Sequence, residues 1–118
     1  MATTNIGFSE ETYTILKQYL FYKESTNTYT KIGGSGNMYV GGYQMGAQAL
    51  QTIGYLKTGS YARQGAAAVF NPKNWTGKGG VYSARDFLTN PEVQERALRE
   101  NVSHNYRVLV RYGIIKPG

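Results

Sequence analysis

The chain has 118 residues, of which 41% are hydrophobic, 14% aromatic and 17% charged, with a net charge of +6. This composition predicts one folded domain over residues 1–118 and excludes an intrinsically disordered tail. The absence of cysteine excludes disulfides, thiolate zinc sites, iron–sulfur clusters and a cysteine nucleophile.

Positive charge is concentrated in the middle of the chain, because residues 25–85 contain no acidic residue. This pattern predicts attraction to an anionic partner, which is nucleic acid, an acidic membrane face or a cell-wall polymer, or else charge that only keeps the surface soluble. We expect no membrane span, since no long apolar run occurs, and no signal peptide, since residues 1–9 lack a basic start and an apolar stretch.

A first helix is predicted over about residues 10–23. Ser9 is a suitable N-cap, and two glutamates follow it in the first turn, where the helix dipole favours acids. Leu16 and Leu20 form an apolar row, and Glu24 is its next member. Glu24 is therefore either an acid held at the end of an apolar helix face or a solvated residue just beyond the helix.

The next segment, residues 26–46, is rich in Gly and Tyr, which predicts turns and short strands. Gly33-Gly34-Ser35-Gly36 suits the turn of a small hairpin, with Tyr39-Val40 on the returning strand. No Gly-Lys-Ser/Thr follows, so this is not a phosphate-binding loop. A helix is predicted next, over about residues 44–52.

The second half of the chain is predicted to end in helices. Residues 59–80 read as mostly irregular, with one helical turn at about residues 66–70, and a short helix follows over residues 83–88. Asn90 as N-cap and Pro91 at the first position then begin the longest helix. Its apolar row, which predicts core packing, contains Leu98, Val102, Tyr106 and Leu109, and His104 lies off that row. The predicted fold class is α+β, mainly α-helical, with a small Gly/Tyr-rich β or loop segment after the first helix.

Carboxylate chemistry is the best-supported chemistry in this sequence. One histidine and scattered acids do not make a metal site, no serine has a base at a recognisable spacing, and no cofactor motif is present, so we expect neither metal nor cofactor. A carboxyl group at the end of an apolar helix face, such as Glu24, is suited to protonate a leaving oxygen. The acid-free, Tyr-rich segment would then form the wall of a sugar-binding cleft, because aromatic faces cover sugar rings.

Several motifs also occur in a characteristic order. They are Glu24-Ser25, then Tyr39-Val40-Gly41-Gly42-Tyr43-Gln44-Met45-Gly46 and Ala49-Leu50, then Asn74-Trp75-Thr76-Gly77-Lys78-Gly79-Gly80, Asp86-Phe87-Leu88, Asn90-Pro91 and Gln94. This series resembles the lysozyme-like superfamily of goose-type lysozymes and soluble lytic transglycosylases. It is most similar to phage-encoded muramidase-like proteins.

The resemblance implies a lysozyme-like fold and cleavage of the bond between N-acetylmuramic acid and N-acetylglucosamine in peptidoglycan. It implies Glu24 as the catalytic acid, and the implied substrate-binding residues are Ser25, Tyr39, Tyr43, Gln44, Met45 and Tyr106. Tyr106 is the candidate substitute for the family's third motif, an Ala-Tyr-Asn-like stretch that is missing here. The implied partners are peptidoglycan and phage structural proteins. The chain would be made in the host cytoplasm and act on the bacterial wall, alone or as part of a virion.

The sequence leaves open the type of cleavage reaction and two alternative functions. Ordinary glycoside hydrolysis uses two carboxylates, whereas a lytic transglycosylase needs one, because the acetamido and 6-hydroxyl groups of its substrate complete the reaction. The first alternative function is a catalytically inactive lysozyme-like module that binds or assembles in a phage particle. The second is a basic nucleic-acid-binding domain, although no motif of that class is present.

Overall fold

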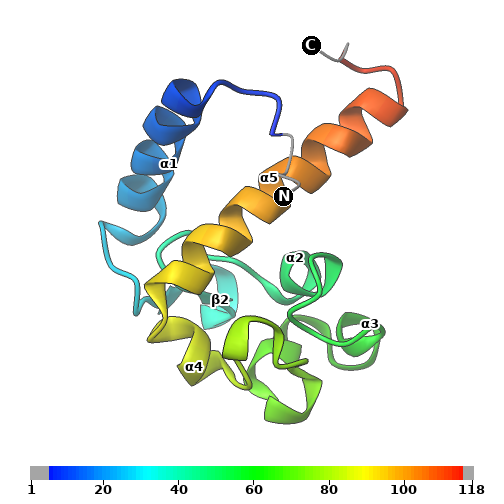
Figure 1. Ribbon diagram of the computed structural model, residues 1–118. Coiled ribbons are helices and arrows are strands. Elements are labelled where there is room, and N and C mark those ends of the chain that lie inside the picture. Colours follow the sequence, from blue (N-terminus) through cyan, green and yellow to red (C-terminus); the bar gives the residue numbers. More distant parts are fainter. Residues whose placement is uncertain (1–5, 116–118) are drawn as a thin grey trace.

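The computed structural model describes residues 6–115. They form a mainly helical domain with one two-stranded sheet, which confirms the predicted α+β, mainly α-helical class (Figure 1). The α-helices and strands, in chain order, are α1 (Glu10–Ser25), β1 (Ile32–Gly33), β2 (Tyr39–Val40), α2 (Ala47–Thr52), α3 (Ser60–Gln64), α4 (Ala84–Leu88) and α5 (Pro91–Arg111). Short 3-10 turns between them are η1 (Ser35–Asn37), η2 (Gly65–Phe70), η3 (Pro72–Asn74) and η4 (Lys78–Gly80). Within residues 6–115, none of the helices combines the length and apolar character that a bilayer crossing needs.

Helix α1 begins as predicted and continues to Ser25. The Ser9 hydroxyl accepts a hydrogen bond from the Thr12 N–H at 3.1 Å, which confirms the N-cap. Thr26 ends the helix in a left-handed conformation with φ 56°. Glu24 therefore lies in the last turn of the helix and not beyond it.

The inward face of α1 differs from the predicted apolar row. Leu16 and Leu20 are only half-buried, whereas Tyr13, which lies off that row, is 3% exposed. Lys17 also lies on the inward side, where it forms an ion pair with Glu95 of α5. The prediction is correct for Leu20, which packs against the core, but it misses Tyr13 and Lys17. Helix α1 meets α5 partly through polar side chains, which an apolar pattern does not register.

The predicted hairpin is present. Strands β1 and β2 are antiparallel, with Ile32 opposite Val40 and Gly33 opposite Tyr39. The turn between them places Gly34 at φ 72°, a conformation that glycine adopts without steric cost. Val40 is fully buried and Tyr39 is exposed, so the hairpin packs one side on the core and presents the Tyr39 ring at the surface.

The middle of the chain contains more helix than predicted. Helix α2 begins at Ala47, later than residue 44, because Gln44 takes φ 51° and Gly46 is the N-cap. Residues 59–80, predicted to be mostly irregular, contain α3 as well as three 3-10 turns. Helix α3 was not predicted, because its N-cap residue is Gly59, which has no side chain that could indicate the start of a helix.

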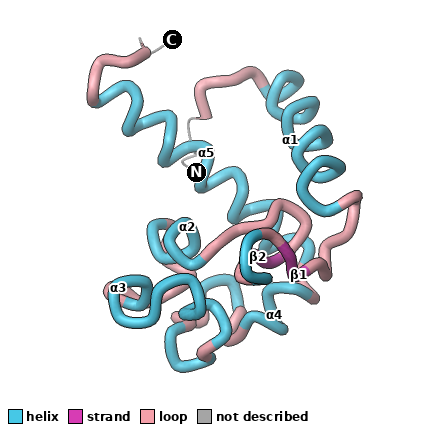
Figure 2. Tube along the Cα trace, turned by 180° about the vertical axis from the view of Figure 1, so that it is seen from behind, coloured by secondary structure: helices cyan, strands magenta, loops and turns pink. Residues whose placement is uncertain are grey.

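The last two helices follow their predicted caps. The side chains of Ser83 and Asn90 accept hydrogen bonds from the N–H groups of Asp86 and Val93. Helix α5 then crosses the whole domain, and its C-terminal half extends beyond α2 and α3 (Figures 1 and 2). The predicted core row is therefore correct for its first part alone: Leu98 is buried, Val102 half-buried and Leu109 36% exposed.

The hydrophobic core joins the hairpin, α2 and the following loops to the first half of α5. Its members include Val40, Met45, Leu50, Tyr55, Leu56, Val69, Trp75, Phe87 and Leu98. The Trp75 indole N–H donates to the Val69 carbonyl at 2.9 Å, so the ring is anchored as well as buried. This packing supports the hairpin from the core side. The candidate cleft lies where the hairpin approaches the C-terminal end of α1.

Candidate active-site cleft

A cleft of about 370 Å³ lies where the C-terminal end of α1 approaches the hairpin. It is lined by Glu24 from α1 and by Lys31, Gly34, Tyr39 and Gln44 from the hairpin and the residues around it. Three of the sequence-predicted site residues, Glu24, Tyr39 and Gln44, are thus brought together. Glu24 is the carboxylate among these lining residues, and it is half-buried.

Lys31 holds the hairpin to the end of α1. Its ammonium group donates a hydrogen bond to the backbone carbonyl of Glu24 at 3.1 Å. A cation at the C-terminal end of a helix interacts favourably with the helix dipole and with the carbonyls left without helical partners. The contact places a positive charge in the same cleft as the Glu24 carboxyl group, and it ties the position of Glu24 to that of β1.

The Tyr39 ring lies against two glycines. A Cβ atom added at Gly34 would come within 2.6 Å of the ring, and one added at Gly46 within 2.8 Å, so both positions need glycine for the ring to stay where it is. Tyr39 also lines a second hollow of about 240 Å³, which is lined by Tyr61 of α3 as well. Tyr39 is therefore the shared wall of two adjoining hollows, with Glu24 in one and Tyr61 in the other.

Gln44 closes the base of the cleft. Its amide group donates hydrogen bonds to the carbonyls of Lys31 at 3.2 Å and Gly41 at 2.8 Å. These two bonds hold together the residues that enter and leave the hairpin, and they accompany the left-handed backbone of Gln44. The side-chain oxygen is buried and has no hydrogen-bond partner within residues 6–115.

The other predicted site residues point away from the cleft. Ser25 is buried, and its hydroxyl donates to the Phe21 carbonyl and accepts from the Thr28 N–H, so it stabilises the end of α1. Met45 is buried in the core beside Val40.

Tyr43 and Tyr106 lie elsewhere as well. Tyr43 is 9% exposed, and its hydroxyl donates to Glu95 at 2.7 Å. Tyr106 lines a separate hollow of about 310 Å³ between α5 and the residues that precede α1. The structure therefore places Tyr106 outside the cleft of Glu24, and the position expected of a third motif is not taken by this residue.

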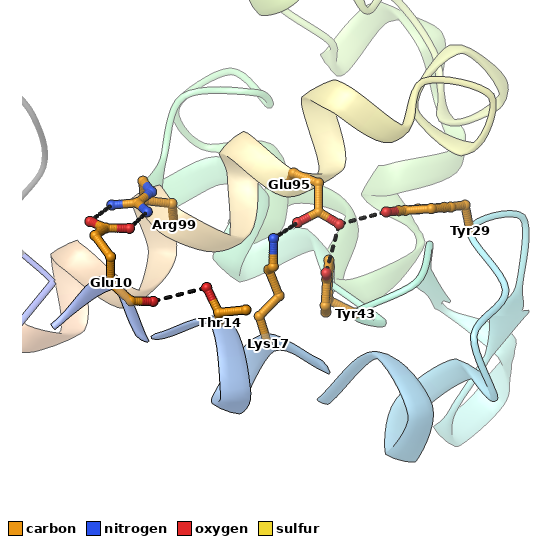
Figure 3. A network of polar contacts seen from close by, with 7 residues as sticks. All are labelled: Glu10, Thr14, Lys17, Tyr29, Tyr43, Glu95 and Arg99. Atoms are coloured by element: carbon orange, nitrogen blue, oxygen red, sulfur yellow. Dashed lines mark hydrogen bonds and ion pairs between the residues drawn. The ribbon is translucent and has the colours of Figure 1, made fainter. Parts of the chain in front are cut away.

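A polar network joins α1, the segments that flank the hairpin, and α5 (Figure 3). The Glu95 carboxylate of α5 accepts hydrogen bonds from the hydroxyls of Tyr29 at 2.6 Å and Tyr43 at 2.7 Å, and it pairs with Lys17 of α1 at 3.2 Å. The Phe21 ring packs on both tyrosines, with centroid distances of 4.6 and 5.4 Å. The network fixes the last turns of α1, and with them Glu24, relative to the hairpin.

The network also shifts the pKa values of its members. Burial raises the pKa of Glu95, but the hydrogen bonds from Tyr29, Tyr43 and Lys17 together outweigh burial and leave the pKa below its usual range. Burial and the bond to Glu95 raise the pKa of Tyr29 to about 12, and the same two causes raise that of Tyr43 further. Glu95 is therefore the charged centre of the network, and the two tyrosines stay protonated donors.

Gln94, next to Glu95, secures the loop that follows β2. Its side chain is 1% exposed. The side-chain oxygen accepts from the Gly42 N–H at 2.7 Å, and the amide group donates to the carbonyls of Tyr29 at 3.0 Å and Phe87 at 2.8 Å. One glutamine thus joins α5 to both segments that flank the hairpin.

Sequence reasoning missed four residues of this region: Lys31, Tyr61, Gln94 in its structural role, and Glu95. For Gln94 a signal was available, because the apolar row of α5, extended back four residues from Leu98, arrives at it. For the other three, no local pattern indicates their partners. Within residues 6–115, no group of three or more His, Cys, Asp or Glu side chains is arranged so that it could hold a metal ion.

Comparisons with protein-family models, with curated proteins and with solved structures find no match to this chain. The functional interpretation therefore depends on the cleft itself and on the motif residues that line it.

Proposed function

We propose that this domain cleaves a glycosidic bond of bacterial peptidoglycan, with Glu24 as the single general acid, in a phage-related setting. The observation that carries the proposal is the grouping of Glu24, Tyr39 and Gln44 around one open cleft. These are a proton donor, an aromatic face and a polar amide, the three kinds of group that a sugar-cleaving site requires. A lysozyme-like fold is part of the same proposal.

The reaction begins with transfer of the Glu24 carboxyl proton to the glycosidic oxygen. The bond from that oxygen to the anomeric carbon then breaks, and the leaving sugar departs as an alcohol. The resulting oxocarbenium-like centre is captured by water in a hydrolase, or by the 6-hydroxyl group of the same sugar in a lytic transglycosylase. The proton released by that water or hydroxyl returns to the Glu24 carboxylate, which restores the acid. Among the described residues lining the cleft there is no second carboxylate, which favours the route that needs one acid.

The adjoining hollow supports a substrate longer than two sugars. Tyr39 and Tyr61, 37% and 41% exposed, both line this hollow, and Tyr39 also lines the cleft of Glu24. Exposed aromatic faces of this kind cover the apolar faces of sugar rings.

The decisive experiment measures the release of soluble fragments from purified peptidoglycan. We expect Glu24→Gln to slow release by about 10²-fold or more, the usual contribution of a general acid, with an unchanged unfolding midpoint. Glu11→Gln is the matched control, because Glu11 is an exposed carboxylate on the same helix. Equal release by Glu24→Gln and the unaltered protein would overturn the proposal, and mass analysis of the fragments for anhydro or reducing ends decides between the two routes.

A further inference from the structure

A row of basic and acidic side chains, with one histidine among them, runs along one face of α5. Arg96, Glu100, His104, Arg107 and Arg111 are spaced by three or four residues, so they share one face of the helix. We call these five residues, together with Lys78, the α5 stripe. Glu100, His104, Arg107 and Lys78 line a hollow of about 400 Å³ with Thr52, Ile53 and Gly54 at the end of α2. None of these residues lines the Glu24 cleft.

One cation of the stripe is held in place by the fold. The Lys78 ammonium pairs with Glu100 at 3.0 Å, donates to the Ile53 carbonyl, and lies 4.6 Å from the centroid of the buried Tyr55 ring. Lys78 and Glu100 therefore neutralise each other and form a rigid floor of the hollow.

The arginines of the stripe are not neutralised in this way. The ion pairs within residues 6–115 join Lys17 to Glu95, Lys78 to Glu100 and Arg99 to Glu10, and none includes Arg96, Arg107 or Arg111. Arg107 donates to the neutral hydroxyl of Ser103, which orients its guanidinium group without cancelling its charge. Within residues 6–115 the stripe thus carries three arginines that form no ion pair, spread over about 22 Å at a rise of about 1.5 Å per residue.

We propose that the α5 stripe binds an anionic polyol-phosphate chain of the bacterial cell wall, a claim that rests on the proposed function for its setting. Guanidinium groups bind phosphate oxygens through two parallel hydrogen bonds, and their spacing along a helix suits an extended polymer better than a single ion.

A polyol phosphate is favoured over a single-stranded nucleic acid by the lining of the hollow. Proteins that bind single strands combine positive charge with aromatic rings on which bases stack. Neither the stripe nor the lining of the hollow includes an exposed Tyr, Phe or Trp, since the Tyr55 ring lies buried under Lys78.

The test is a titration with poly(glycerol phosphate), followed by calorimetry at several salt concentrations. We expect a slope near −2 for log affinity against log salt, from three phosphate contacts at about 0.7 each. The double variant Arg107→Gln/Arg111→Gln should lose at least tenfold in affinity. The control Arg63→Gln/Arg85→Gln removes the same charge from exposed positions elsewhere and should lose less than twofold.

Three outcomes overturn the proposal: no binding of poly(glycerol phosphate), equal losses in the two double variants, or tighter binding of oligodeoxythymidylate. The proposal is also separable from the cleavage function. On peptidoglycan stripped of anionic polymers, Arg107→Gln/Arg111→Gln should release fragments at the unaltered rate. If Glu24→Gln instead leaves fragment release unchanged while the stripe still binds poly(glycerol phosphate) selectively, the proposed cleavage function is refuted and the proposed binding by the stripe is not.

Discussion

A substitution of Gln94 should separate the contribution of its hydrogen bonds to stability from the contribution of its buried volume. Replacement by Leu keeps the buried volume similar but removes the partner of the Gly42 N–H and of the Tyr29 carbonyl. The Phe87 carbonyl still accepts from the Asn90 N–H, so it is not orphaned. A buried group left without a partner costs about 1–3 kcal/mol. Two such groups give a loss of about 3 kcal/mol in the free energy of unfolding, a large part of the ~5–15 kcal/mol of a typical domain.

Gln94→Glu gives a second, sharper readout. Its carboxylate would still accept from the Gly42 N–H, but its other oxygen would face the carbonyls of Tyr29 and Phe87, which offer no proton. Folding then favours the protonated carboxyl, so the folded-state pKa of the introduced group is raised. Stability is present below the unfolded-state pKa and is lost as the pH rises through the folded-state value. We therefore expect Gln94→Glu to be less destabilised in mild acid than at neutral pH.

Urea unfolding followed by the fluorescence of Trp75, the single tryptophan, measures both effects. Gln18→Leu is the control, because Gln18 is an exposed glutamine of α1 and its replacement should change stability by less than about 0.5 kcal/mol. A loss below about 1 kcal/mol for Gln94→Leu, or no pH dependence for Gln94→Glu, would refute the reasoning about the orphaned groups.

Two further predictions concern the walls of the cleft. Because the pKa of Glu95 is lowered by folding, its contribution to stability is complete above pH 4.5 and is lost as the pH falls through the folded-state value. The free energy of unfolding should therefore fall less steeply with decreasing pH in Glu95→Gln than in the control Glu92→Gln. An identical pH dependence of the two variants would contradict the stabilising role assigned to the charged Glu95. Gly46→Ala would place a Cβ 2.8 Å from the Tyr39 ring at an ordinary φ of −98°. We expect it to slow peptidoglycan cleavage several-fold with little change in the unfolding midpoint, and an unchanged rate would show that the position of the ring does not matter.

Local hydrogen bonding explains what the sequence predicted well. The caps at Ser9, Ser83 and Asn90 each join a side chain to a backbone N–H three residues later, so both partners are visible in a short window. The hairpin was predictable for a similar reason, since its glycines have the conformational freedom that its turn requires.

Contacts between distant segments explain what was missed. Gln44 is by propensity a helix former, but its hydrogen bonds to the Lys31 and Gly41 carbonyls accompany a left-handed backbone and delay the start of α2. The predicted site residues Tyr43 and Met45, on either side of Gln44, are buried and do not line the cleft. A motif names the residues of a tight segment, but the direction in which each side chain points depends on the surface against which the segment packs.

The two walls of the cleft are held by different mixtures of interaction. The hairpin and α2 rest on the apolar core. Helix α1 adds polar contacts with α5 to the apolar packing of Tyr13, Leu20 and Phe21: Lys17 pairs with Glu95, and Glu10 pairs with Arg99 (Figure 3). Polar contacts depend on distance and angle more steeply than apolar packing does, and exposed ones contribute little to stability. A substitution at one of these polar contacts between α1 and α5 should therefore shift Glu24 relative to Tyr39 while the domain stays folded. We expect such a variant to lose cleavage activity before it loses its fold.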